Sequence, residues 1–144
     1  MKSINRKQNE QKIKFSDNEI KFLLGNEGCR IATVSPDNTP HITPVSYIFE
    51  DGFFYFATDY NTRKYKNLKT NPNVALVVDI YSSVNNRAVI VQGKVTIIEQ
   101  GKEFQKLYDN FNTRFEWVRI DPWNEGQAPF IRVNPYKKIS WGLD

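Results

Sequence analysis

The residues with the clearest chemical potential lie in a short basic segment, residues 58–72, between two apolar runs. Asn61 or Thr62 can cap a helix that begins there, because a short side-chain oxygen accepts hydrogen bonds from free backbone N–H groups. Arg63 and Lys64 then fall in the first turn. Two cations at the positive end of a helix dipole are unfavourable unless an anion lies opposite them. The segment therefore indicates a phosphate site, and the alternative is a solvated basic helix face.

Other groups that could carry out catalysis are few. The sequence has no G-x-S-x-G elbow, no Walker loop and no G-x-G-x-x-G loop. Cys29 is the only cysteine and His41 the only histidine, so neither an internal disulfide nor a zinc site is expected. We interpret Cys29 as a small buried apolar residue. An enzyme with so few acid and base groups needs a cofactor to supply the chemistry.

Composition and charge limit the class of protein. The 144 residues fit one domain, and a mean hydropathy of −0.58 without a long apolar run excludes a membrane span. Residues 1–15 have no signal-peptide core, which predicts a cytoplasmic protein. Net charge is +4 in residues 1–14, +3 in residues 58–72 and −3 in the remainder. We predict a disordered or loosely attached basic tail over residues 1–15 and one folded domain over residues 16–144.

Basic charge confined to a tail and one helix makes nucleic acid an unlikely partner, because a binding face would need basic and aromatic residues interleaved on the strands. The alternative of a nucleic-acid-binding barrel would use the tail together with Lys66, Lys69 and Tyr65.

The elements that would position the basic segment follow from local patterns. Ser16 and Glu19 form a capping box for a helix over residues 17–25, which Gly25 would end. Three strands, over residues 30–35, 41–49 and 53–58, are separated by turn residues, which predicts an antiparallel meander. After the basic helix, strands are expected at 74–80 and 87–99, with a bend or bulge at Gly93. A long amphipathic helix over 101–119, a loop over 121–129 and strands at 130–133 and 137–141 complete the chain. The sum is a mainly β fold, a closed or half-closed antiparallel barrel with a few flanking helices.

The order of these motifs resembles one family. Thr58, then Thr62-Arg63-Lys64, then Asn71-Pro72 before an apolar strand is similar to the FYT-x-x-x-SRK…NP signature of pyridoxamine 5'-phosphate oxidase-like FMN-binding split-barrel proteins. The resemblance covers residues 27–141. NNRAVIVQGKV looks like the central strand of that barrel, and FIRVNPYKKISW looks like its closing strand. The family implies a six-stranded antiparallel split β-barrel and a homodimer with two FMN sites at the subunit interface.

The resemblance also implies a role for individual residues. Arg63 and Lys64 match the pair that holds the FMN phosphate, and Thr62 replaces the serine beside them. Trp141 matches the tryptophan that closes over the cofactor from the other subunit. The remaining implied cofactor contacts are Thr58, the backbone near Ala57, and the strand along the flavin, His41, Ile42, Thr43, Pro44, Val45 and Ser46, with His41 where the oxidases carry an arginine.

The implied activity is that of an FMN-dependent oxidoreductase, which transfers hydride or electrons between bound flavin and an unidentified small substrate. Departures from the pattern argue against oxidation of pyridoxamine phosphate itself. Ser46 replaces the lysine that faces the substrate phosphate, Ala88 replaces a glutamine, and the substrate-holding arm after Trp141 is not present in this sequence. The alternatives are a reductase of the same fold that uses the deazaflavin F420, and a non-enzymatic flavin- or haem-binding module.

Overall fold

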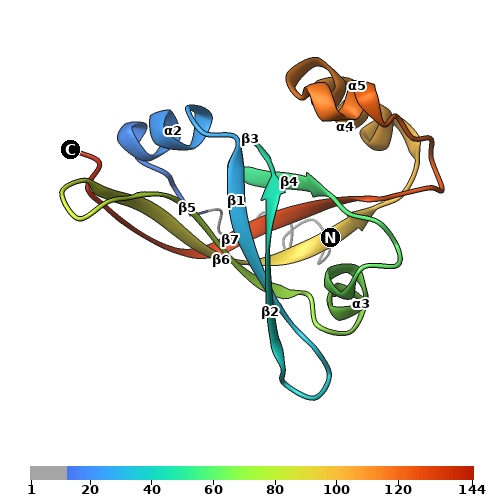
Figure 1. Cartoon of the computed structure of the whole chain (residues 1–144), viewed down its shortest axis with the longest axis horizontal. Helices are drawn as coiled ribbons and strands as arrows, with labels where there is room; N and C mark the ends of the chain where they lie inside the picture. Colours follow the sequence, from blue (N-terminus) through green and yellow to red (C-terminus); the bar gives the residue numbers. More distant parts are fainter. Residues whose placement is uncertain (1–12) are drawn as a thin grey trace, which may run out of the picture.

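A single antiparallel sheet of seven strands dominates the computed structural model, which describes residues 13–144 (Figure 1). Its strands follow the order β2-β1-β5-β6-β7-β4-β3. They are β1 (Gly28–Val34), β2 (Pro40–Ser46), β3 (Ile48–Glu50), β4 (Phe53–Ala57), β5 (Asn73–Tyr81), β6 (Asn86–Ile98) and β7 (Phe130–Trp141). The helices are α2 (Asp17–Leu24), α3 (Arg63–Thr70), α4 (Gly101–Arg114) and α5 (Glu116–Ile120). The predicted mainly β fold is confirmed, with seven strands instead of six.

The extra strand arises at Tyr47, which divides the predicted strand 41–49 into β2 and β3. β2 pairs with β1 and β3 pairs with β4, so the two halves form opposite edges of the sheet. The Tyr47 side chain is 1% exposed, and its hydroxyl donates to the carbonyl oxygen of Leu23 at 2.5 Å. Its backbone N–H donates to the carbonyl oxygen of Glu27 at 2.9 Å. Both predicted antiparallel pairings are therefore present, but the middle strand is divided: the chain turns at a buried corner, and the sheet curls into a half-barrel.

Gly93 produces the predicted irregularity in β6. The pairing of β6 with β7 shifts register between Gln92 and Gly93. A Cβ atom on Gly93 would lie 2.7 Å from the carbonyl oxygen of Asn134, so only glycine allows β7 to approach this closely. Pro135 pairs with Gly93 at this point, where its missing N–H group is tolerated. β7 therefore continues through Asn134 and Pro135 as one strand, where the sequence predicted two.

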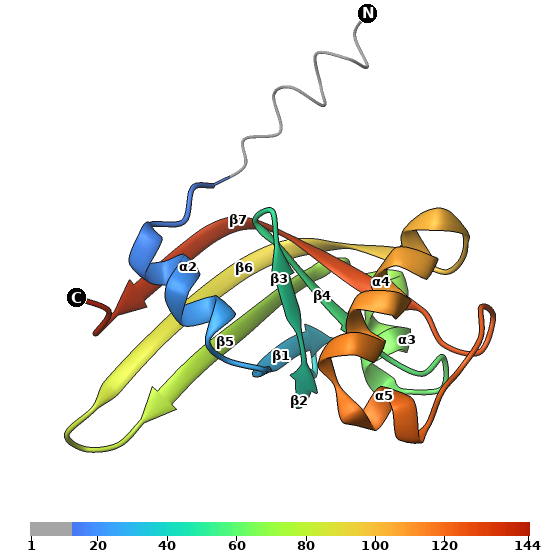
Figure 2. The ribbon, with the colours of Figure 1, turned by 90° about the horizontal axis from the view of Figure 1, so that it is seen from above.

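The predicted helix 101–119 is also divided. Phe115 has extended backbone angles, φ −117° and ψ 121°, and separates α4 from α5. Its ring is 4% exposed and lies 5.5 Å from the Phe111 ring, within an apolar cluster beneath both helices. The chain turns here because Phe115 packs inward. Figure 2 shows that α3, α4 and α5 gather at one end of the sheet and that the C-terminus lies at the other.

α2 is attached to β7 through one carboxylate. The predicted capping box is present: the Ser16 N–H donates to Glu19 Oε1 at 2.8 Å, and the Glu19 N–H donates to Ser16 Oγ at 3.2 Å. Glu19 also accepts a hydrogen bond from Lys138 and one of 2.7 Å from Ser140. Burial alone would raise the Glu19 pKa, but these partners and the Ser16 amide lower it to about 2.

The predicted basic tail falls mostly outside the described residues, since it covers residues 1–15 and the description begins at residue 13. Phe15 packs edge-on against Phe49, with ring centroids 5.1 Å apart. In residues 13–144, no helix has the length and apolar character needed to cross a membrane.

The Glu19 contacts predict a pH-dependent contribution to stability. Because its folded pKa lies below the usual 4.5, the stabilisation is complete above that value and is lost as pH falls toward 2. Glu19→Gln should lower the free energy of unfolding by at most about 3 kcal/mol at pH 7, and the difference should shrink below pH 4. Urea unfolding at several pH values measures this. Glu103→Gln, which removes an exposed ion pair with Arg132, is the control and should cost under about 1 kcal/mol. An equal Glu19→Gln effect at pH 7 and pH 3 would contradict the assignment.

Candidate functional site

Thr62, one of the two predicted caps, begins α3. Its Oγ1 accepts a hydrogen bond from the Tyr65 N–H at 3.1 Å and lies 2.9 Å from Thr58 Oγ1. The cap therefore fixes the start of α3 against the end of β4. The backbone N–H groups of Arg63 and Lys64 have no acceptor among the described residues. Two free amides at a helix start provide donors for an anion.

Lys64 is a buried cation that forms no ion pair in residues 13–144. Its side chain is 8% exposed, and no ion pair includes it. Its ammonium donates to Thr43 Oγ1 at 3.1 Å and lies 5.8 Å from the centre of the Phe56 ring. Burial lowers the Lys64 pKa, against smaller opposing effects of Cys29 and Asp59. An ammonium has three N–H donors, so this one retains capacity for an anionic ligand.

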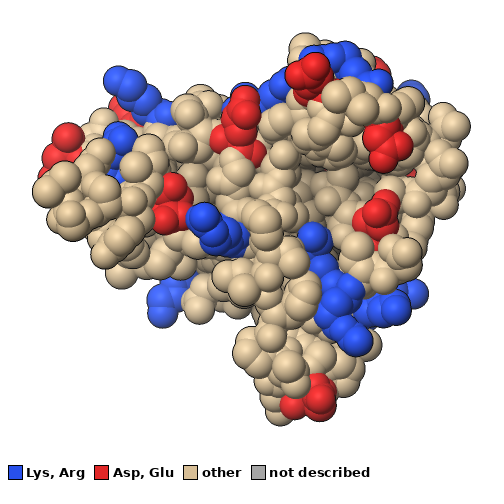
Figure 3. Space-filling view, viewed as in Figure 1, with Lys and Arg blue, Asp and Glu red and all other residues tan. Residues whose placement is uncertain are grey.

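Arg63 lies beside a cavity of about 270 Å³ between the β1–β2 turn and α3. His41 and Asn67 also line this cavity, so the structure places His41 and Arg63 on the same opening. Asn67 is 1% exposed; its Nδ2 donates to Thr33 Oγ1 at 3.0 Å, while its Oδ1 has no partner within the described part of the chain. Figure 3 shows basic side chains gathered over α3. The cavity therefore combines the Arg63 cation, the Asp37 carboxylate and an unsatisfied buried oxygen.

The predicted flavin strand, residues 41–46, presents two faces. His41, Thr43 and Val45 are half-buried, and the alternating Ile42 and Pro44 are exposed on the other face. At the end of the strand, Ser46 Oγ accepts a hydrogen bond from Trp117 Nε1 at 3.1 Å. The structure thus brings Thr43 to Lys64 and His41 to the Arg63 cavity, but it does not bring Ile42 or Pro44 to them.

Two other predicted contacts, Ala57 and Trp141, lie apart from the cavity beside Arg63. Ala57 ends β4 and lines a second cavity with Thr58. Trp141 ends β7 and donates from Nε1 to Asn86 Oδ1 at 2.9 Å. Figures 1 and 2 place that end of β7, near the C-terminus, far from α3. Within one chain Trp141 therefore cannot reach Arg63, and its assignment as a lid from another subunit stays a prediction.

Sequence reasoning missed Asn67 and Trp117. Asn67 lies one helical turn after Arg63, so the four-residue spacing could have placed it beside the site. Trp117 had no local signal, because it reaches β2 only after the chain turns at Phe115.

The arrangement can bind an anion but offers little acid–base chemistry of its own. Burial raises the Cys29 pKa to about 12, so its thiol stays protonated at neutral pH. Over the described residues, no group of three or more His, Cys, Asp or Glu side chains could hold a metal ion. The free donors at the start of α3 and the unpaired Lys64 match what a cofactor phosphate requires.

Several known proteins are similar to this chain. A 5a,11a-dehydrotetracycline/5a,11a-dehydrooxytetracycline reductase of Streptomyces rimosus is 26% identical over 137 residues, which cover 90% of this chain and 84% of that protein. The crystal structure of a FAD-binding protein from Mesorhizobium loti is 20% identical, with a TM-score of 0.71 and coverage of 88% and 93% of the two chains. The haem storage protein HutZ of Vibrio cholerae is 14% identical, with a TM-score of 0.77 and coverage of 88% and 95%. Both structural likenesses support the fold.

The family model described as pyridoxamine 5'-phosphate oxidase matches residues 16–137. This match includes the Thr62 cap, the Arg63–Lys64 pair and nearly the whole of the curled sheet. The chain therefore belongs to the pyridoxamine 5'-phosphate oxidase family.

Proposed function

We propose that this protein is a flavin-dependent oxidoreductase that binds FMN with its phosphate at the start of α3. The observation that carries the proposal is the buried Lys64 ammonium, which forms no ion pair within residues 13–144. Burying an unpaired cation is unfavourable, so such a cation is typical of a site that receives an anion. Arg63 and the two free amides add donors around the same position.

The bound flavin would supply the redox chemistry, accepting and returning hydride or electrons. The chain's own residues would hold and orient it. Arg63, Lys64 and the amides of α3 would bind the phosphate, and the Thr62 hydroxyl, fixed by Thr58, would keep the helix start in place. The Streptomyces rimosus relative is named as a reductase, which supports a redox role, and the Mesorhizobium loti structure is named as FAD-binding, which supports a flavin.

The substrate is a small molecule other than pyridoxamine phosphate. Ser46, which replaces the substrate-facing lysine of the oxidases, is occupied by its hydrogen bond from Trp117. It offers no cation to a second phosphate. F420 remains the alternative cofactor, because its phosphate could use the same donors. We also propose the cytoplasmic location expected from the sequence.

A homodimer is part of the proposal, and an exposed face of the sheet supports it. Residues that pair directly across neighbouring strands project from the same face. One such row crosses five strands and consists of Pro44, Arg30, Val77, Ile90 and Ile139. Ile139 is 60% exposed, although it lies in a strand. A largely apolar open row of this kind is typical of a surface that another molecule covers.

The same face would allow Trp141 to reach the cofactor of a partner subunit. Trp141 lies two residues beyond Ile139 and projects from the same face, at the opposite end of the row from Pro44 in β2. A two-fold axis that lies in the plane of the interface, parallel to the strands and at the middle of the row, would place Trp141 of each subunit near the partner's β2. This geometry supports the lid assignment from the other subunit.

The cofactor prediction concerns the two cations at the start of α3. The double variant Arg63→Ala, Lys64→Ala should weaken FMN binding at least a hundredfold, because each charge-assisted hydrogen bond contributes about 1.5–3 kcal/mol. Flavin absorption of the purified protein and FMN titration measure the effect. Lys66→Ala, Lys69→Ala removes the same charge from exposed positions of the same helix and should retain FMN.

Three results would oppose the cofactor prediction. A colourless protein that takes up neither FMN nor F420 would refute the flavin site. A haem Soret band instead of flavin absorption would favour the haem-binding alternative. Equal losses in both double variants would show that overall charge, not the α3 start, determines binding.

The dimer prediction separates assembly from cofactor closure. Ile139→Asp should yield a monomer that loses FMN, because a charge on the apolar row disfavours burial. Trp141→Ala should remain dimeric but retain FMN less well. Light scattering after gel filtration and flavin absorption measure the two properties. Val84→Asp, at a 94% exposed position outside the row, is the control. A dimeric Ile139→Asp variant would exclude this face as the interface, and unchanged FMN retention by Trp141→Ala would exclude the lid role.

A further inference from the structure

A second cavity, of about 350 Å³, opens beside the proposed cofactor site. It lies between the end of β4, α5 and the loop that follows α5. Thr58 belongs to its wall and also holds the Thr62 cap of α3. Trp117 belongs to its wall and also bonds to Ser46 of β2. The cavity is therefore joined on two sides to residues of the α3 and β2 site.

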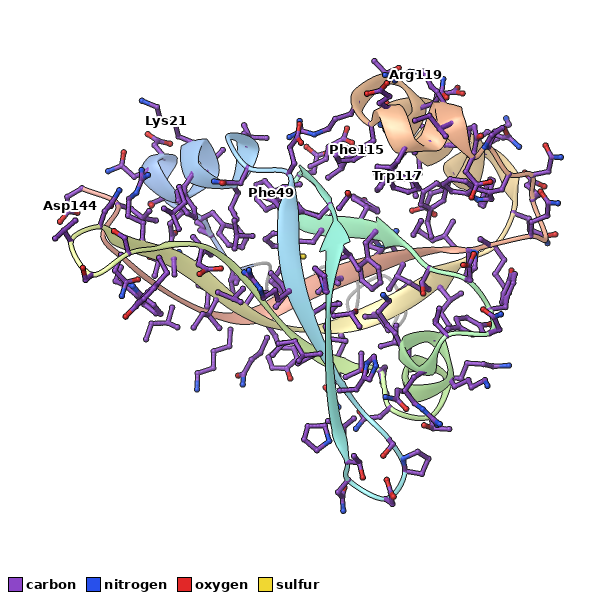
Figure 4. All side chains as sticks on the ribbon, viewed as in Figure 1. Lys21, Phe49, Phe115, Trp117, Arg119 and Asp144 are labelled. Atoms are coloured by element: carbon purple, nitrogen blue, oxygen red, sulfur yellow. The ribbon has the colours of Figure 1, made fainter. Side chains whose placement is uncertain are left out.

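Aromatic rings form one part of this wall. The Trp117 and Trp123 rings are nearly parallel, with centroids 5.9 Å apart and an interplanar angle of 3°. Trp117 is 41% exposed, and Figure 4 shows it beneath α5, facing the space between the helices and the sheet. Trp123 Nε1 is buried and has no hydrogen-bond partner in the described chain. An exposed indole can stack on a flat ligand, and a buried indole N–H without a partner can donate a hydrogen bond to it. Both groups in one wall are typical of a site for a flat ligand.

The charged groups of the wall are all acidic. Asp59 and Asp121 line the cavity, and neither takes part in an ion pair among residues 13–144. Gln127 uses its Oε1 to accept from the Asn124 N–H at 2.6 Å, so its amide N–H groups are not committed by that bond. Figure 3 shows a hollow between the α4–α5 lobe and the body of the molecule. This cavity therefore has no cationic side chain in its wall, whereas Arg63 lines the cavity at the start of α3.

We propose that this cavity binds the substrate and that the substrate is a flat, conjugated molecule carrying a cationic nitrogen. The indoles offer stacking and cation–π contacts, and the two unpaired carboxylates attract a cation. The same carboxylates repel phosphate-bearing or carboxylate-bearing molecules, whereas the cations and free amides at the start of α3 attract them. The inference rests on the proposed function, because it assigns the ligand as a substrate only if a flavin occupies the neighbouring site.

Two probes with the same ring and opposite charge test the proposal. 1-Naphthylmethylamine and 1-naphthoate are titrated into the FMN-loaded protein, with calorimetry for affinity and the flavin absorption spectrum for contact with the cofactor. We expect the amine to bind roughly tenfold more tightly than the carboxylate and to shift the flavin bands. Asp121→Asn and Asp59→Asn should each reduce this preference several-fold. Trp117→Leu should weaken both probes together. Asp109→Asn, an exposed position on α4 that does not line the cavity, is the matched control.

Each outcome bears on a separate part of the inference. Equal affinity for the two probes, or a preference that Asp121→Asn and Asp59→Asn leave unchanged, would overturn the assignment of a cationic ligand. Amine binding without any change in the flavin spectrum would overturn the substrate role. A protein that cannot be loaded with FMN or F420 would remove the proposed function, and the substrate role with it, whatever the probes show. Circular dichroism of every variant confirms that the fold is intact.

Discussion

The buried corner at Tyr47 is the constraint on which the rest of the structure depends. Its hydroxyl and backbone N–H are held by Leu23 and Glu27, and its ring is almost fully enclosed. The strand that leads into this corner pairs at one edge of the sheet, and the strand that leaves it pairs at the other. The two edges therefore approach each other, and the curled sheet places β2 close to the end of β4 and the start of α3.

Because the two edges of the sheet approach each other, binding groups from β2, α3 and the end of β4 lie close together. Lys64 from α3 donates to Thr43 of β2, while the Thr62 cap is fixed by Thr58 after β4. The result is a rigid start of α3 with free donors and a desolvated cation. Beyond Thr58 the charge changes sign, because Asp59 and Asp121 line the adjoining cavity. The start of α3 suits a cofactor phosphate, and the adjoining cavity suits a cationic substrate. The two ligands would therefore be oriented by charge, without any catalytic acid or base.

Much of this arrangement could be predicted from local sequence. The Ser16–Glu19 capping box, the Thr62 cap and the bulge at Gly93 depend on neighbouring residues or on a single backbone requirement, and the pattern indicated each of them. The corner at Tyr47 and the turn at Phe115 depend on distant packing, which residue spacing does not encode. For the same reason the contact between Trp117 and Ser46, 71 residues apart, had no signal. The contact of Lys64 with Thr43 and the position of His41 beside the Arg63 cavity likewise depend on the closure of the sheet.

The central claim is that a cofactor phosphate neutralises the buried Lys64 at the start of α3. A crystal structure of the protein grown with FMN tests this most directly. The account predicts phosphate density within hydrogen-bond distance of Lys64 Nζ and the backbone N–H groups of Arg63 and Lys64, with the ring system extending along β2. Phosphate density elsewhere on the molecule, or an FMN complex in which Lys64 makes no contact with the phosphate, would contradict it.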